Sequence, residues 1–342
     1  DKGELPAQEQ RREKIEKLFG NAARVLKDLK ADYVFGPVLD VVKDSENKEN
    51  LMSAHDRAYS SDADTVVTLA KMYVDAMHGQ QIKVIGKHYF GTGYTTIDPH
   101  KGLPTLEALS AEERQKIEKP FRALATSLDG IMVTHILCHS SDIPDSVNKA
   151  AYQYIREQLG YKGIVITDDL DMGAIEERYA SEREWVVAAS LDALVAGADG
   201  IIIGHGTDTL AITSAALAFV FENLPIPVIL VGSQRSTDRG STDAAANLIC
   251  AAHFIAKTDF TGVAICMHES TSDNTCLIFP PCKTRKMHTS RRDAFKAVND
   301  KAIARINYET KKIEFLKEYP KKANEKLIAR NEFEDKVAIV KS

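Results

Sequence analysis

Acidic, basic and histidine side chains follow three short apolar runs in the first half of the sequence. They are Lys87 and His88 after residues 82–85, His135 after residues 130–133, and Asp168 with Asp169 after residues 164–166. A glycine-punctuated loop also carries Asp98 two positions before His100. A carboxylate can act as a nucleophile, and a histidine oriented by a carboxylate can exchange protons near neutral pH. The pattern predicts nucleophilic and acid/base chemistry, although Asp168 and Asp169 also suit the first turn of a helix.

The elements that must position these side chains alternate along the chain. Apolar residues at helical spacing predict a helix over 13–29, and a strand over 33–42 follows it. Further helices are predicted at 62–77, from Ser110, and at 147–159, 182–196, 209–222 and 241–256. Strands are predicted at 82–85, 130–135, 163–167, 200–204, 227–231 and 262–267. Such alternation predicts an α/β fold with a mostly parallel sheet, in which the reactive side chains share the carboxyl edge.

The alternation ends after Met267. Two short runs around Pro280-Pro281 predict a hairpin, and further strands are expected at 302–307 and 312–315. Residues 317–342 are strongly charged, with one apolar run at 337–340. We therefore predict partial (βα)8-type barrel units over 1–204, Rossmann-like three-layer α/β units over 205–316, and a charged linker with a truncated strand over 317–342.

Composition restricts the function. The 342 residues are 44% hydrophobic and 27% charged with a net charge of −5, which is typical of a globular protein and argues against non-specific nucleic-acid binding. No apolar run reaches the roughly 18 residues that cross a bilayer. The five cysteines include no C-x-x-C pair, and Cys276 and Cys282 with His268 or His288 fit no zinc module, so we expect no metal, no cofactor and a cytoplasmic location.

Several sequence motifs of the first half occur in a recognisable order. They are Gly36 to Val41, Lys87-His88 with the loop to His100, Met132 to Ile136, Gly163 to Met172, and Ala196 to Asp199. Over about residues 20–204 this order resembles the family 3 glycoside hydrolases, specifically the β-N-acetylhexosaminidases that act on cell-wall sugars. The resemblance implies a TIM barrel and a retaining glycosidase mechanism.

The resemblance also implies residue roles. Asp168 would attack the anomeric carbon, and His100 paired with Asp98 would supply and remove the proton. Sugar hydroxyls would be held by Lys87, His88, Arg57 and His135. The chain departs from the family at Tyr89, Phe90 and Thr92, and the first two barrel strands of the family would lie upstream of the sequence.

A second group of motifs begins at His205. They are His205 to Thr209, Pro227 to Arg239, and Arg285 to Phe295. Over about residues 199–342 they resemble the L-asparaginase family, in the branch of the archaeal glutamyl-tRNA amidotransferases whose asparaginase-like component releases ammonia for a partner enzyme. The resemblance implies a nucleophilic role for Thr207, binding of the substrate amino group by Asp208, and a proton relay through Lys286. The Thr-Gly-Gly-Thr loop of that family does not occur in the sequence.

Two partial resemblances that meet at one strand predict a chimera-like chain. The first hypothesis is a retaining glycosidase acting on an oligosaccharide, because its nucleophile and acid/base pair are both present. The second is an amidohydrolase that supplies ammonia to a partner amidotransferase subunit for tRNA-dependent transamidation, with weak or absent activity because one threonine is missing. The third is an inactive scaffold, in which Thr207 and Asp208 cap a helix and the basic cluster from Lys283 to Arg292 is a solvated edge. No membrane or direct nucleic-acid contact is expected.

Overall fold

The chain was described from a computed structural model, which covers residues 7–29, 31–46, 49–106, 109–140, 142–170, 172–180, 185–235, 241–321 and 325–330. The chain divides into two compact units, Asp1–Ala198 and Asp199–Ser342. Each unit combines helices with a sheet that is wholly or partly parallel, so the predicted α/β class is confirmed. No helix among the described residues is long and apolar enough to cross a membrane.

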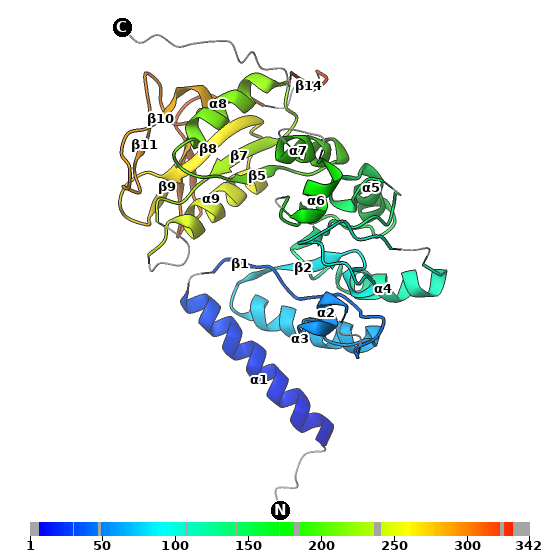
Figure 1. Cartoon of the computed structure of the whole chain (residues 1–342). Helices are drawn as coiled ribbons and strands as arrows, with labels where there is room; N and C mark the ends of the chain where they lie inside the picture. The colour runs from blue at the N-terminus through cyan, green and yellow to red at the C-terminus, as the bar shows by residue number, and fades with distance from the viewer. Residues whose placement is uncertain are drawn as a thin grey trace, which may run out of the picture. The chain divides into compact units, whose positions relative to one another are not determined.

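The first unit contains a four-stranded parallel sheet. Its strands are β1 (Tyr33–Val34), β2 (Lys83–Tyr89), β3 (Gly130–Val133) and β4 (Ile164–Thr167), hydrogen-bonded in the order β1-β2-β3-β4. Its helices are α1 (Ala7–Asp28), α2 (Leu51–Ala54), α3 (Ala63–Gly79), α4 (Ala111–Leu124), α5 (Lys149–Glu157), α6 (Gly173–Arg178) and α7 (Trp185–Ala196). Helix α3 packs against both α1 and α4, as Figure 1 shows for α1.

Local sequence explains where helix α4 begins and what it covers. The Ser110 hydroxyl accepts the Glu113 N–H at 3.1 Å, and the Glu113 carboxylate accepts the Ser110 N–H at 3.0 Å, which forms a capping box. Phe121 on this helix is fully buried against Tyr89 of β2, with ring centroids 5.1 Å apart. The predicted helix start is confirmed, and the helix covers the sheet with aromatic side chains.

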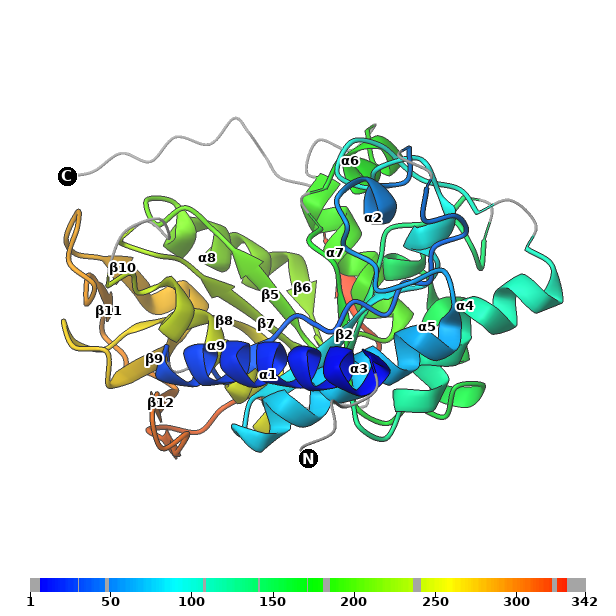
Figure 2. The same ribbon diagram turned by 90° about the horizontal axis from the view of Figure 1, so that it is seen from below.

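The second unit contains a six-stranded mixed sheet. Its strands are β5 (Ile201–Gly204), β7 (Pro227–Val231), β8 (Gly262–His268), β9 (Thr275–Phe279), β12 (Ala304–Asn307) and β13 (Ile313–Phe315), in the order β13-β12-β9-β8-β7-β5. Strands β5, β7 and β8 are parallel, and the other three extend the sheet in antiparallel fashion. Helices α8 (Leu210–Val220) and α9 (Ala244–Lys257) lie on opposite faces of the parallel part (Figures 1 and 2). The unit is therefore a three-layer α/β structure.

Short elements complete the second unit. Strand β10 (Thr284–Lys286) pairs with β11 (Phe295–Ala297), and β6 (Phe221–Glu222) pairs with β14 (Ile328–Ala329). The core between the sheet and α9 is built around Phe254 and Phe260, whose rings lie 5.3 Å apart. The apolar run at 337–340 lies outside the described residues.

The structure differs from the sequence predictions at three elements. The strand expected at 200–204 in the first domain is β5, which pairs with β7 in the second sheet, so four and not five strands form the first sheet. The strand expected at 33–42 is regular only over β1, because Pro37 has no N–H to donate to a ladder. The runs around Pro280-Pro281 form no hairpin, since β9 pairs with β8 and β12 whereas β10 pairs with β11.

Candidate active sites

The Asp98 and His100 side chains of the first unit are hydrogen-bonded to each other. Asp98 Oδ1 lies 2.7 Å from His100 Nδ1 and accepts the His100 backbone N–H at 3.0 Å. Burial disfavours the charged form of Asp98, but the hydrogen bonds from His100 outweigh it and lower the Asp98 pKa. The His100 side chain is 59% exposed, so the pair lies at the surface of its unit.

The remaining residues predicted for the glycosidase interact through their charges. The pKa of Lys87 is lowered by burial and by Arg57, and the negative charge of Asp168 opposes this shift. The pKa of His135 is lowered by burial, and Asp168 again opposes the shift. His135 is fully buried, with Nδ1 2.6 Å from Ser146 Oγ and Nε2 2.7 Å from the Asp169 carbonyl oxygen. Both nitrogens of the His135 ring therefore have protein partners.

His88 has a buried partner that the sequence did not reveal. His88 Nδ1 lies 2.8 Å from Asp40 Oδ2, which also accepts the His88 backbone N–H at 3.0 Å. The Asp40 side chain is fully buried and that of His88 is 8% exposed. Asp40 belongs to the Gly36 to Val41 motif, but its type and spacing alone did not distinguish it from a structural carboxylate. The pair fixes one side of the loop that follows β2.

Asp168 does not cap a helix. Its Oδ1 accepts the Asp169 N–H at 3.0 Å, and helix α6 begins only at Gly173, with Met172 as its N-cap. The alternative of a helix cap is therefore wrong. The carboxylate lies directly after β4, at the carboxyl edge of the parallel sheet.

In the second unit, Thr207, Asp208 and Lys286 are in direct contact. The Lys286 ammonium Nζ lies 2.9 Å from Thr207 Oγ1 and 2.8 Å from Asp208 Oδ1. Thr207 and Asp208 follow β5, whereas Lys286 ends β10, 78 residues further along the chain. Lys286 is 13% exposed and Asp208 is 94% exposed. The N-cap of α8 is Thr209, so neither Thr207 nor Asp208 caps that helix.

The end of β7 fits closely against this group. A Cβ placed on Gly232 would lie 2.9 Å from Thr207 Cγ2 and 2.9 Å from Leu210 Cδ1, so the position requires glycine. Beyond it, the buried carboxylate of Asp243 accepts the backbone N–H groups of Gln234 and Arg235 at 3.0 and 2.9 Å. These contacts hold the ends of β5 and β7 together at the carboxyl edge of the sheet.

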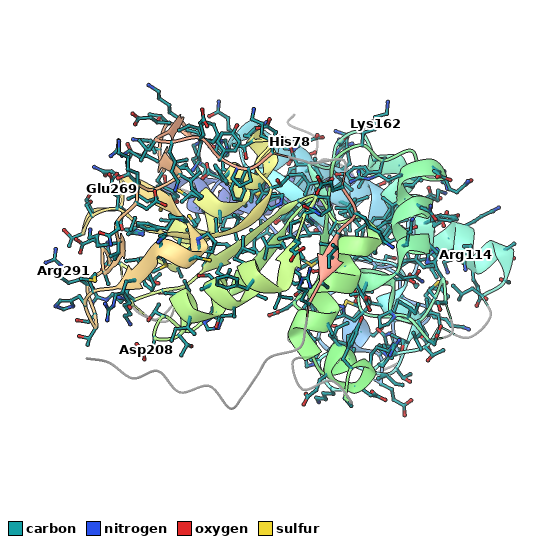
Figure 3. All side chains as sticks on the ribbon, turned by 90° about the horizontal axis from the view of Figure 1, so that it is seen from above. His78, Arg114, Lys162, Asp208, Glu269 and Arg291 are labelled. Carbon is teal, nitrogen blue, oxygen red and sulfur yellow. The ribbon has the colours of Figure 1, made fainter. Side chains whose placement is uncertain are left out.

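The basic cluster from Lys283 to Arg292 is largely paired with carboxylates. Arg291 donates two hydrogen bonds of 2.9 Å to Asp293, and Arg292 donates one of 2.5 Å to Asp273. Arg292 is only 16% exposed. Figure 3 labels Arg291 and Asp208 near the same edge of the second unit. The expectation of a simple solvated basic edge is therefore wrong for Arg292 and Lys286.

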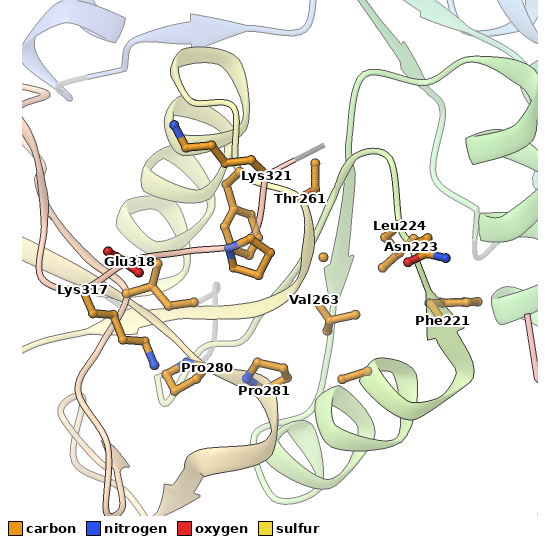
Figure 4. A pocket seen from close by; sticks show the side chains of 15 residues that line it. Phe221, Asn223, Leu224, Thr261, Val263, Pro280, Pro281, Lys317, Glu318 and Lys321 are labelled. Atoms are coloured by element: carbon orange, nitrogen blue, oxygen red, sulfur yellow. The ribbon is translucent and has the colours of Figure 1, made fainter. Parts of the chain in front are cut away.

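A pocket of about 510 Å³ lies elsewhere in the second unit. Its walls include Leu224 before β7, Gly262 at the start of β8, and Pro280 and Pro281 after β9 (Figure 4). These residues mark the amino ends of the parallel strands. The pocket is therefore at the opposite edge of the sheet from Thr207, which follows the carboxyl end of β5.

Two family descriptions match the chain and overlap. "Glycosyl hydrolase family 3 N terminal domain" matches residues 5–231, and "Asparaginase, N-terminal" matches residues 180–321. The first match covers more than half of the chain, so the chain belongs to the glycosyl hydrolase family 3 N-terminal domain family. The overlap of the two matches, residues 180–231, contains β5, α8 and β7.

The curated relatives resemble the second part. The D-type subunit of the glutamyl-tRNA(Gln) amidotransferase of Methanosarcina barkeri is 43% identical over 192 residues, which are 56% of this chain and 44% of that protein. The protein of the same name from Pyrococcus furiosus is 48% identical over 162 residues, 46% of this chain and 36% of its own length. The chain thus spans less than half the length of these relatives.

Solved structures also resemble the chain. A glycosyl hydrolase of family 3 from Mycobacterium smegmatis is 28% identical with a TM-score of 0.46, over 54% of this chain and 57% of that one.

The relatives correct the first functional hypothesis. Curated relatives at 40–50% identity are named as subunits of a glutamyl-tRNA(Gln) amidotransferase, and the glycosidase resemblance is limited to the domain family and structural neighbours. The expectation of a β-N-acetylhexosaminidase as the main activity is therefore wrong. The fold supplies a physical reason, because four paired strands among the described residues do not close an eight-stranded barrel around Asp168 and His100.

Proposed function

We propose that residues 199–321 form an asparaginase-type amide-hydrolysing site that releases ammonia from asparagine or glutamine. The observation that carries the proposal is the contact of Lys286 with Thr207 at 2.9 Å and with Asp208 at 2.8 Å. The named relatives and the asparaginase match over residues 180–321 support it independently of this geometry.

The proposed chemistry begins at the Thr207 hydroxyl. A threonine hydroxyl is a weak nucleophile, so it needs an adjacent base. Neutral Lys286 takes the hydroxyl proton while Thr207 Oγ1 bonds to the amide carbon. The proton then passes to the departing nitrogen, ammonia leaves, and water hydrolyses the acyl-enzyme ester. Asp208, which is 94% exposed, is accessible on the solvent side to bind the amino group of the substrate.

The reaction requires a partner for its product. Because the relatives are named subunits of a glutamyl-tRNA(Gln) amidotransferase, we propose that the ammonia is used by a partner amidotransferase subunit. The chain has no Thr-Gly-Gly-Thr loop to supply the second threonine of the family, so turnover by the chain alone should be slow.

Ammonia release from asparagine and glutamine, measured with a coupled dehydrogenase assay, tests the proposal. We expect slow release by the full chain, loss of that release in Thr207→Ala, and partial retention in Thr207→Ser, which keeps the hydroxyl. Thr209→Ala is the matched control, because the Thr209 side chain forms no capping hydrogen bond. Release that is equal in Thr207→Ala and the unaltered chain would contradict the proposal. A chromogenic N-acetylglucosaminide should give no turnover.

A further inference from the structure

A separate group of polar side chains lies in the first unit, in the loop that follows β3. Among the residues that the structure describes, Cys138, His139 and Asp145 form one group whose possible ligand atoms all lie within 4.8 Å of one another. None of the three belongs to the two candidate active sites. Sulfur, imidazole nitrogen and carboxylate oxygen together form a donor set that suits zinc.

The His139 ring is held in place but is only half satisfied. Its Nδ1 lies 2.7 Å from Asp145 Oδ2, and the same carboxylate accepts the His139 backbone N–H at 3.0 Å. The rings of Phe90 and Tyr154 pack near it, with centroids 6.0 and 5.2 Å away. The side chain is nine-tenths buried, yet Nε2 is a buried atom with no hydrogen-bond partner. A nitrogen lone pair in that state is the atom with which neutral imidazole binds a metal.

The carboxylate beside His139 needs a positive charge. The Asp145 side chain is fully buried, and such a charge is expensive to bury unless it is paired or bound to a metal. Its hydrogen bonds from His139 come from a backbone N–H and from a ring that can remain neutral. A dication at this position would compensate the charge of Asp145 directly.

The Cys138 thiol is also out of balance. Burial and the charge of Asp145 raise the pKa of Cys138 to about 12, although Arg114, labelled in Figure 3, favours the thiolate from 3.7 Å. Cysteine binds metal ions as the thiolate, and a bound dication removes the proton. Thiolate plus carboxylate then balance the two charges of the ion.

Nearby polar atoms point in the same direction. Glu118 Oε1 and Tyr89 Oη are both buried without a hydrogen-bond partner, and the charge of Glu118 acts on both Cys138 and Tyr89. Buried polar atoms without partners are uncommon and indicate a missing water molecule or ion.

We propose that Cys138, His139 and Asp145 bind a zinc ion. Three protein ligands leave one position of a tetrahedral ion open to water, and Cys138 and His139 are only partly buried residues, so the ion can exchange with solvent. The site is independent of the amide-hydrolysing group, which belongs to the other unit.

The test uses the full chain, stripped with a chelator, reloaded with zinc and analysed for metal content. We expect one zinc per chain, and loss of this stoichiometric zinc in Cys138→Ser. Cys282→Ser, which changes an exposed cysteine, is the matched control and should keep the metal. Asp145→Asn should weaken zinc binding about 10- to 100-fold. Cobalt loaded in place of zinc should give a thiolate-to-metal absorption band that Cys138→Ser removes.

A second measurement needs no variant and therefore survives a folding defect. Zinc should slow alkylation of Cys138 by iodoacetamide in the unaltered chain, measured by mass spectrometry, whereas Cys282 in the same sample should react at an unchanged rate. Zinc content that is equal in Cys138→Ser and Cys282→Ser, or alkylation of Cys138 that zinc does not slow, would overturn the proposal.

Discussion

The two units bring their candidate residues together in different ways. In the first unit, Asp168, His135 and Lys87 influence one another's ionisation, but the hydrogen bonds of His135 are to Ser146 and a main-chain carbonyl. In the second unit, Lys286 contacts Thr207 and Asp208 directly. The first sheet has four paired strands among the described residues, whereas the second has six.

The difference shows how architecture limits a site that is built from part of a domain. A barrel active site draws on loops from many strands around a closed ring, so it is complete only when the ring is closed. A site at the carboxyl edge of an open sheet needs only a few neighbouring strand ends. The ends of β5 and β7 with the β10 strand are enough to assemble the Thr207 group.

The largest effect that we predict concerns Lys286. Lys286→Met removes the proposed base, and loss of a positioned base typically lowers kcat/KM by about 10²- to 10⁴-fold. Ammonia release measures this, with Lys283→Met as the control because the Thr207 hydroxyl is hydrogen-bonded to Lys286 and not to Lys283. An unchanged rate would remove Lys286 from the mechanism and abolish the contrast between the units.

The next effect compares two aspartate–histidine pairs of the first unit. Asp40→Ala leaves His88 without its buried partner and should lower the free energy of unfolding by about 3–5 kcal/mol. Asp98→Ala breaks a pair in which His100 is 59% exposed, and should cost less than about 1 kcal/mol. Urea unfolding followed by circular dichroism measures both. Equal losses would show that burial does not distinguish the pairs.

Gly232→Ala should have a moderate effect. Its Cβ would lie 2.9 Å from Thr207 Cγ2 and 3.0 Å from the His205 carbonyl oxygen, so the end of β7 must shift. Overpacking of this kind costs about 1–3 kcal/mol of unfolding free energy. Gly204→Ala, which has open space around the added methyl, should be tolerated. If both variants unfold at the same urea concentration, the close fit at β7 is not a constraint.

The smallest effect depends on pH. Hydrogen bonds from Arg305, at 2.6 to 2.9 Å, lower the pKa of Glu269 against the opposing effect of burial. A lowered folded-state pKa means that this stabilisation is present above the unfolded pKa of about 4.3 and is lost as pH falls through the folded value. Glu269→Gln should therefore cost about 0.5–1 kcal/mol at pH 7, where the pair is partly exposed, and little near pH 2. A loss that is independent of pH would contradict the ion pair.

Much of the fold could be predicted from local sequence. The alternation of apolar strands and helices indicated the class, and β7 has the predicted bounds. The pairing of β5 could not be predicted, because an apolar strand such as Ile201–Gly204 carries no information about which sheet it joins. The hairpin around Pro280 failed for a similar reason, since each flanking strand found a partner elsewhere.

The candidate residues were predicted unevenly. Thr207, Asp208 and Lys286 were named from motifs, and the structure brings them together across 78 residues of sequence. Asp40 was missed because its partner His88 lies 48 residues away, and only the folded chain shows that the carboxylate is buried. The group of Cys138, His139 and Asp145 was missed because its spacing matches no familiar zinc pattern.

Strand β5 is the last strand of its sheet, and this position has a consequence for how such a chain can arise. Among the described residues, β5 pairs with β7 on one side and with no other strand. Its outer edge can accept another parallel neighbour without disturbing β7, because ladder hydrogen bonds do not depend on side-chain identity. The same strand lies in the stretch that both families match. In evolutionary terms β5 is a joint, where segments from two lineages can be exchanged while the backbone pairing remains intact.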